Sequence, residues 1–103
     1  MTIEVISIPD CPNHHPTVDR VKALLNAEGV FAEVREVLVD SVSDVRALRF
    51  IGSPTVRVNG KDVEPLAFAQ AAMSCRIYED GSGIPPENLL RRAIVSAARE
   101  EHA

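Results

Sequence analysis

The sequence has no tryptophan, and its aromatic residues are limited to three phenylalanines and one tyrosine among 103 residues. This is too few for a platform that stacks nucleic-acid bases. The 11 lysines and arginines are outnumbered by 15 acidic residues and, apart from Arg91-Arg92, are scattered, so no basic stripe is present. No apolar run approaches a membrane span, and the N-terminus lacks the features of a signal peptide. We therefore expect a cytoplasmic protein with neither nucleic-acid nor membrane partners.

Cysteine is also scarce, since Cys11 and Cys75 are the only two in the sequence. In a cytoplasmic protein, two cysteines are typically free, redox-active or metal-binding rather than a structural disulfide. The sequence lacks a glycine-rich phosphate loop and the Gly-x-Ser-x-Gly motif of serine hydrolases. What the chain does have is 46% hydrophobic residues, enough for one ordinary globular domain with its own core.

The first predicted elements are a strand and a helix that flank Cys11. Residues 2–8 are β-branched and apolar on both faces, which indicates a central strand. Apolar residues at helical spacing follow and end at Gly29, a natural helix stop. Pro16 limits the helix start, because proline is tolerated only in the first turn. Either Asn13 is the N-cap, or the helix begins at Cys11 and is kinked at Pro16; we favour the first.

Residues 31–39 predict a second strand, more polar than the first and therefore nearer the edge of the sheet. Ser41 and Asp44 have the spacing of a capping box, so we expect a short helix from there to Gly52.

The second half of the chain predicts a hairpin and a last helix. Pro54 belongs at the start of a strand over residues 55–58. Asn59-Gly60 is a strong two-residue turn into a return strand over 61–64. Pro86 starts a final amphipathic helix.

Residues 65–85 form an insert whose path is open. Residues 67–73 fit one or two helical turns, 74–78 fit an extended segment, and 79–85 form a loop. The element order β-α-β-α-β-β-insert-α predicts an α/β fold, with a mixed four-stranded sheet and helices on both faces.

With this order in place, the chain resembles the thioredoxin-like superfamily over nearly its whole length, the insert excepted. The resemblance is carried by Cys11-Pro12-Asn13-His14 between the first strand and helix, by Pro54 opening the third strand, and by the closing hairpin and helix. Together with residues 48–58 and 74–78, it is closest to small bacterial thioredoxin-family proteins that are sometimes labelled alkylmercury-lyase-like.

The resemblance implies a cis peptide before Pro54, a nucleophilic Cys11, and a substrate surface formed by Pro12, Ser53 and Pro54. Two departures are visible: His14 stands where dithiol oxidoreductases have a second cysteine, and the double-glycine glutathione site is absent. These departures count against a glutathione-dependent activity.

The residues themselves point to thiol chemistry at Cys11. At a strand-to-helix junction, unpaired N–H groups and the helix dipole favour the thiolate. The alternative is a vestigial or buried cysteine on a reused fold. Cys75 is the sole candidate for a resolving thiol, or else a small buried hydrophobe. His14 is a candidate catalytic group beside Cys11, or else a solvated surface histidine, and His15 is weaker. Tyr78, close to Cys75, is a candidate for lining the substrate pocket, with packing as the default role.

Three functions remain open on these grounds. The first is thiol-based redox or thiol transfer with a protein or small-molecule thiol or disulfide. The second is binding of a soft metal or organometal by Cys11 and Cys75 with His14. The third is a non-catalytic interaction domain. A structural zinc is not expected, because ligands crowded on one helical turn cannot all reach one ion, and no cofactor is expected.

Two further expectations concern the surface. Glu33, Glu36, Glu79 and Glu87 show no paired arrangement and are interpreted as solvated carboxylates. A homodimer through the polar edge strand or the last helix is compatible with the sequence, which does not decide the oligomeric state.

Overall fold

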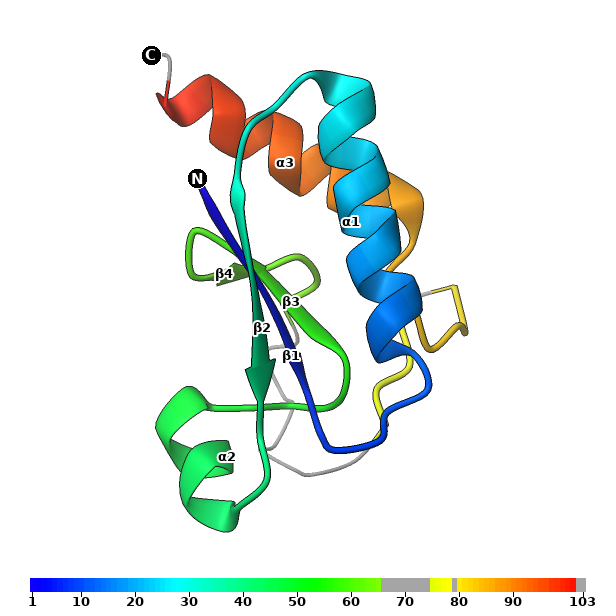
Figure 1. Ribbon diagram of the computed structural model, residues 1–103, viewed down its shortest axis with the longest axis vertical. Helices are drawn as coiled ribbons and strands as arrows, with labels where there is room; N and C mark the ends of the chain where they lie inside the picture. Colours follow the sequence, from blue (N-terminus) through cyan, green and yellow to red (C-terminus); the bar gives the residue numbers. More distant parts are fainter. Residues whose placement is uncertain (66–74, 79, 102–103) are drawn as a thin grey trace.

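The computed structural model describes residues 1–65, 75–78 and 80–101 (Figure 1). The elements are β1 (Thr2–Ser7), α1 (His14–Glu28), β2 (Glu33–Leu38), α2 (Val42–Leu48), β3 (Thr55–Val58), β4 (Lys61–Asp62) and α3 (Glu87–Glu101). This is the predicted element order. The helical turns predicted over residues 67–73 lie outside the described residues. Among those that are described, no helix combines the length and apolarity needed to cross a membrane.

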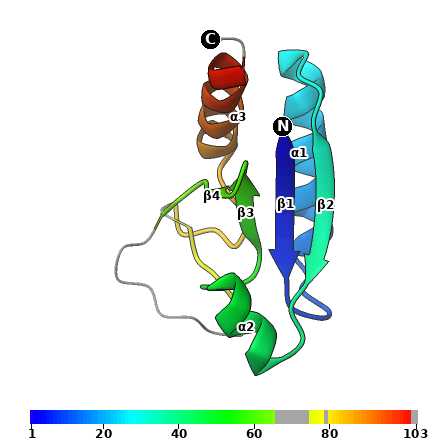
Figure 2. The ribbon, with the colours of Figure 1, turned by 90° about the vertical axis from the view of Figure 1, so that its left-hand side faces the viewer.

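The strands form one mixed four-stranded sheet, as predicted, and their order in it is β2-β1-β3-β4. β1 pairs in parallel with β2 and antiparallel with β3, and β3 pairs antiparallel with β4. Figure 2 shows β2, β1 and β3 side by side, with α1 behind β1 and β2. The polar strand β2 is at the edge, where its exposed residues meet solvent.

Two hydrophobic clusters lie on opposite faces of the sheet, because successive residues of β1 point to opposite sides. Ile3 and Val5 are fully buried in a cluster with residues of α1, β3 and α3. Ile6 points the other way and packs with Val45 of α2 and with Phe50. Helices therefore cover both faces, α1 and α3 on one and α2 on the other.

The ends of α1 follow the sequence signals. Asn13 is the N-cap and Gly29 ends the helix in the left-handed conformation at φ 64°. The Asn13 side chain makes no capping bond; instead its carbonyl oxygen accepts from the Thr17 hydroxyl at 2.6 Å and from the Thr17 N–H at 3.2 Å. Pro16 is thus the third helical residue, and Cys11 precedes the helix.

The predicted end of α2 at Gly52 is wrong. Ser41 caps the helix as expected, its Oγ accepting from the Asp44 N–H at 3.1 Å. However, Arg49 takes the left-handed conformation at φ 52° and ends the helix there. Gly52 is needed for another reason: a Cβ at this position would lie 2.9 Å from Cβ of Arg76, and its φ is +140°.

The return strand β4 is shorter than the predicted 61–64. The Val63 N–H still donates to the Val56 carbonyl at 3.0 Å, and the Glu64 N–H then donates to the side chain of Asp62 at 2.8 Å, in a turn that ends the pairing with β3. Residues 75–78 then pass beside the start of β3, where Cys75 forms an isolated parallel bridge with Ser53. The peptide between Ser53 and Pro54 is cis, as the resemblance implied.

Replacing Ser41 with alanine should lower the free energy of unfolding by about 1 kcal/mol, because the Asp44 N–H loses its acceptor. Urea denaturation followed by circular dichroism measures this change. The matched control is Ser43→Ala, an exposed position of the same helix, which should stay within about 0.5 kcal/mol of the parent. Equal effects of the two substitutions would contradict the assigned cap.

Candidate functional site

Cys11 lies in the short connection between β1 and α1. Only 9% of the residue is exposed. Asp10, immediately before it, takes a left-handed conformation at φ 60°, and the His14 N–H donates to the Cys11 carbonyl at 3.2 Å. These two features turn the chain from the strand into the helix. They hold Cys11 at the carboxyl end of β1 and directly before the N-terminus of α1.

A hydrogen-bonded chain of three side chains crosses the same end of the sheet. His14 Nδ1 lies 2.6 Å from Ser7 Oγ, and His14 Nε2 lies 2.7 Å from Glu36 Oε1. Ser7 is buried, whereas the Glu36 side chain is half exposed. The chain therefore ties the last residue of β1 to the first turn of α1 and to the edge strand β2.

The register of the parallel pair explains why these residues meet. Ser7 is opposite Leu38 and Val5 is opposite Glu36, so Ser7 and Glu36 point to the face that α1 covers. His14 is the first residue of α1. The helix start therefore sets its imidazole between a hydroxyl from the central strand and a carboxylate from the edge strand.

Both ring nitrogens of His14 are thus engaged away from Cys11. Because an ionised carboxylate only accepts hydrogen bonds, Nε2 carries a proton and donates to Glu36. This bond holds the pKa of the Glu36 carboxyl below its ordinary value, with the nearby charges of His14, Lys22 and His15 adding to the effect. In this arrangement neither ring nitrogen of His14 makes a hydrogen bond to the Cys11 thiol.

A pocket of about 440 Å³ opens beside Cys11. Its lining residues are Ser7, Ile8, Asp10, Cys11, His14, His15, Glu36, Val37 and Leu38. The pocket thus combines a thiol, two imidazoles and two carboxylates with apolar walls. It lies where the carboxyl ends of the parallel strands β1 and β2 meet, a position at which open α/β sheets typically bind ligands.

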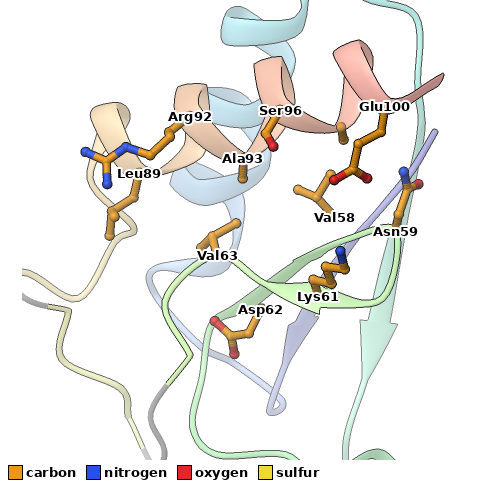
Figure 3. A pocket seen from close by; sticks show the side chains of 11 residues that line it. Val58, Asn59, Lys61, Asp62, Val63, Leu89, Arg92, Ala93, Ser96 and Glu100 are labelled. Atoms are coloured by element: carbon orange, nitrogen blue, oxygen red, sulfur yellow. The ribbon is translucent and has the colours of Figure 1, made fainter. Parts of the chain in front are cut away.

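A second hollow, of about 270 Å³, lies between α3 and the β3–β4 hairpin (Figure 3). Apolar side chains such as Val58 and Val63 line it together with Lys61, Arg92 and Glu100. No cysteine or histidine is among its described lining residues. It therefore lacks the nucleophile and the imidazoles that the Cys11 pocket has.

Cys75 is exposed, and both cysteines are free thiols. It is placed beside Ser53 by the parallel bridge, and the next residue, Arg76, donates its N–H to the Ser53 carbonyl at 2.9 Å. Cys75 is not among the described residues that line the Cys11 pocket. Its role as a resolving thiol stays a prediction.

The substrate-binding candidates fall into two groups. Pro12, next to Cys11, is exposed. Ser53, Pro54 and Tyr78 are buried, and none of these three lines the Cys11 pocket. The Ser53 hydroxyl accepts from the Ile8 N–H at 3.1 Å, which joins the cis-proline turn to the end of the central strand.

Tyr78 packs rather than lining the pocket. Its hydroxyl donates to the Pro54 carbonyl, and its burial raises the pKa of the phenol well above the ordinary value. The guanidinium of Arg76 lies 4.4 Å from the centre of the Tyr78 ring and makes two bonds to the Asp62 carboxylate, at 2.8 and 3.0 Å. Arg76 is itself buried. Through the bond from Tyr78 to the Pro54 carbonyl, this cluster holds the turn at Pro54 in place.

Sequence reasoning missed Ser7 and interpreted Glu36 as an unengaged surface carboxylate. Both lie in predicted strands. The face of the sheet to which each side chain points is determined once the two strands are paired in parallel with the observed register. Comparisons with known proteins add nothing to this site, since no family model, no curated protein and no solved structure matches the chain.

Replacing His14 with alanine should raise the pKa of Glu36 toward the ordinary value of about 4.3, because the carboxylate loses its main hydrogen-bond donor. NMR titration of the side-chain carboxyl carbons measures this. Glu33 on the same strand is the control, because its pKa is held low by Arg35 instead. It should not move in His14→Ala but should rise in Arg35→Gln. An unchanged Glu36 titration in His14→Ala would contradict the hydrogen bond.

Proposed function

We propose that this chain is a thioredoxin-like domain that carries out thiol-based redox or thiol-transfer chemistry, with Cys11 as the nucleophile. The observation that supports it best is the position of Cys11: between a central strand and a helix N-terminus, and on the wall of a pocket with two imidazoles. Positive partial charge at the helix N-terminus stabilises a thiolate, which is the reactive form. The cis peptide before Pro54, the sheet order and the two-sided helix cover support the fold assignment.

The proposed reaction is thiol–disulfide exchange. The Cys11 thiolate attacks one sulfur of a disulfide, a bond forms between Cys11 and that sulfur, and the other sulfur leaves as a thiolate. A second thiol must then attack the Cys11 sulfur and release the bound half of the substrate. Cys75 is the candidate within the chain, and an external thiol is the alternative.

The different solvent exposure of the two cysteines allows a test of this proposal. If access alone set reactivity, the exposed Cys75 would react with disulfides before Cys11, which is 9% exposed. The proposal expects the reverse order. Reduced protein is mixed with a limiting amount of a chromogenic aromatic disulfide, and each cysteine is assigned by peptide mass spectrometry at early times.

We expect the first adduct on Cys11 and a large loss of the fast phase in Cys11→Ser. The matched variant, Cys75→Ser, should keep that phase. First labelling of Cys75, with Cys11 reacting only after denaturation, would refute Cys11 as the nucleophile.

The number of thiolates released in the same reaction tests the resolving role of Cys75. With one equivalent of reagent, resolution by Cys75 releases two thiolates and leaves an internal disulfide that is two hydrogens lighter. Cys75→Ser should release one thiolate and retain the adduct. If wild type also stops at one thiolate with the adduct on Cys11, an external thiol must complete the reaction.

An interaction domain without turnover is the second candidate function. It is favoured by the occupied carbonyl of Ser53, which accepts from Arg76 of the chain itself. A substrate that pairs with the backbone before the cis-proline would have to share or displace that bond. Slow reaction of both cysteines in the folded protein would favour this candidate over exchange chemistry.

A further inference from the structure

Three metal-ligating side chains converge at the mouth of the Cys11 pocket. His14 and His15 come from the first turn of α1, and Glu36 comes from β2. One donor atom of each lies within 4.8 Å of the others. Among the residues that the structure describes, this is the group of histidine, cysteine and acidic side chains with ligand spacing, and it contains neither thiol.

From the sequence alone a structural zinc was not expected, because ligands crowded on one helical turn cannot all reach one ion. Two features of the structure remove that objection. The rings of His14 and His15 meet edge to face with centroids 5.4 Å apart, so they share one side of the helix start. The third donor is supplied from across the pocket by the sheet, on the exposed edge strand.

The distances suit an ion after a small adjustment. Zinc–nitrogen and zinc–oxygen bonds of about 2.0–2.2 Å put tetrahedral ligand atoms roughly 3.4 Å apart. His15 and Glu36 are exposed, so their side chains can move inward by a change of rotamer without disturbing the core. The ion would take the place of the proton that now lies between His14 Nε2 and Glu36 Oε1, which are 2.7 Å apart.

Ser7 supplies the support that a ligating histidine requires. Histidines that bind metal through one nitrogen typically donate from the other to a fixed acceptor. Ser7 Oγ lies 2.6 Å from His14 Nδ1 and is buried at the end of β1. A serine hydroxyl both donates and accepts, so its oxygen can accept a hydrogen bond from Nδ1–H when Nε2 binds the ion. The ring is thereby held with Nε2 facing the other two donors.

We propose that His14, His15 and Glu36 form a binding site for a divalent transition ion of the zinc class, with Ser7 orienting His14. Two imidazoles and one carboxylate are the donors that zinc and its neighbours cobalt, nickel and copper accept. Three protein ligands leave a coordination position open toward the pocket. The site does not depend on thiol exchange at Cys11, because no sulfur belongs to the donor set.

The test uses the untagged 103-residue chain, in which Cys11→Ser and Cys75→Ser remove both thiols. Calorimetric titration with zinc chloride should give one ion per chain. In this parent, His15→Ala and Glu36→Gln should each weaken binding by about tenfold or more, and Ser7→Ala by about 10–100-fold. His102→Ala, which removes the third histidine of the sequence, should leave the affinity unchanged.

Cobalt provides a second readout that does not rely on affinity. The thiol-free parent should convert the spectrum of aqueous cobalt(II) to stronger visible bands, and His15→Ala should abolish them. His15 is exposed, so this variant keeps the fold, which circular dichroism verifies.

Equal zinc affinity in the parent, His15→Ala and Glu36→Gln would overturn the site. So would the absence of zinc binding in the thiol-free parent. Because every arm uses thiol-free protein, these outcomes are independent of whether Cys11 performs exchange.

Discussion

The register between β1 and β2 is the constraint on which the arrangement of this site depends. It sets Val5 opposite Glu36 and Ser7 opposite Leu38. A slip of one residue would turn Glu36 to the other face and leave His14 without its carboxylate. The register is itself favoured by burial, because it packs Val34 of β2 into the cluster of Ile3 and Val37 into the cluster of Ile6 on the other face. Core packing and pocket chemistry are thus set by the same pairing.

A second constraint is the packing around the turn at cis-Pro54. Buried Arg76 pairs with Asp62 and stacks on Tyr78, whose hydroxyl reaches the Pro54 carbonyl. Burying a guanidinium costs several kcal/mol in desolvation, and the bidentate bond to Asp62 offsets that cost. Because Arg76 also donates its N–H to Ser53, the insert braces the cis-proline turn. We infer that residues 75–78 act first as structure, and that any redox role of Cys75 is added to it.

Local signals predicted most of the fold, and long-range pairing decided what they missed. Asn13, Gly29 and Ser41 gave correct helix boundaries because capping involves residues three or four apart. Gly52 gave a wrong end for α2, because the glycine is needed for close contact with Arg76, which lies 24 positions along the chain. Cys11 was found from its place between two elements. Ser7 and Glu36 were not predicted as site residues. Their common contact with His14 depends on the register between β1 and β2, for which the sequence around either residue carries no signal.

The contrast between the two cysteines bears on how this pocket works. The exposed Cys75 is the more accessible thiol, yet it is the enclosed Cys11 that precedes the helix N-terminus and lines one pocket with both imidazoles. Partial burial at such a junction strengthens electrostatic effects because less water screens them. Under the proposed function, His14 would contribute without a hydrogen bond to sulfur, since Ser7 and Glu36 engage both its nitrogens. A bound cation at His14, His15 and Glu36 would add positive charge to the same pocket, so thiol chemistry and metal binding would reinforce rather than exclude each other.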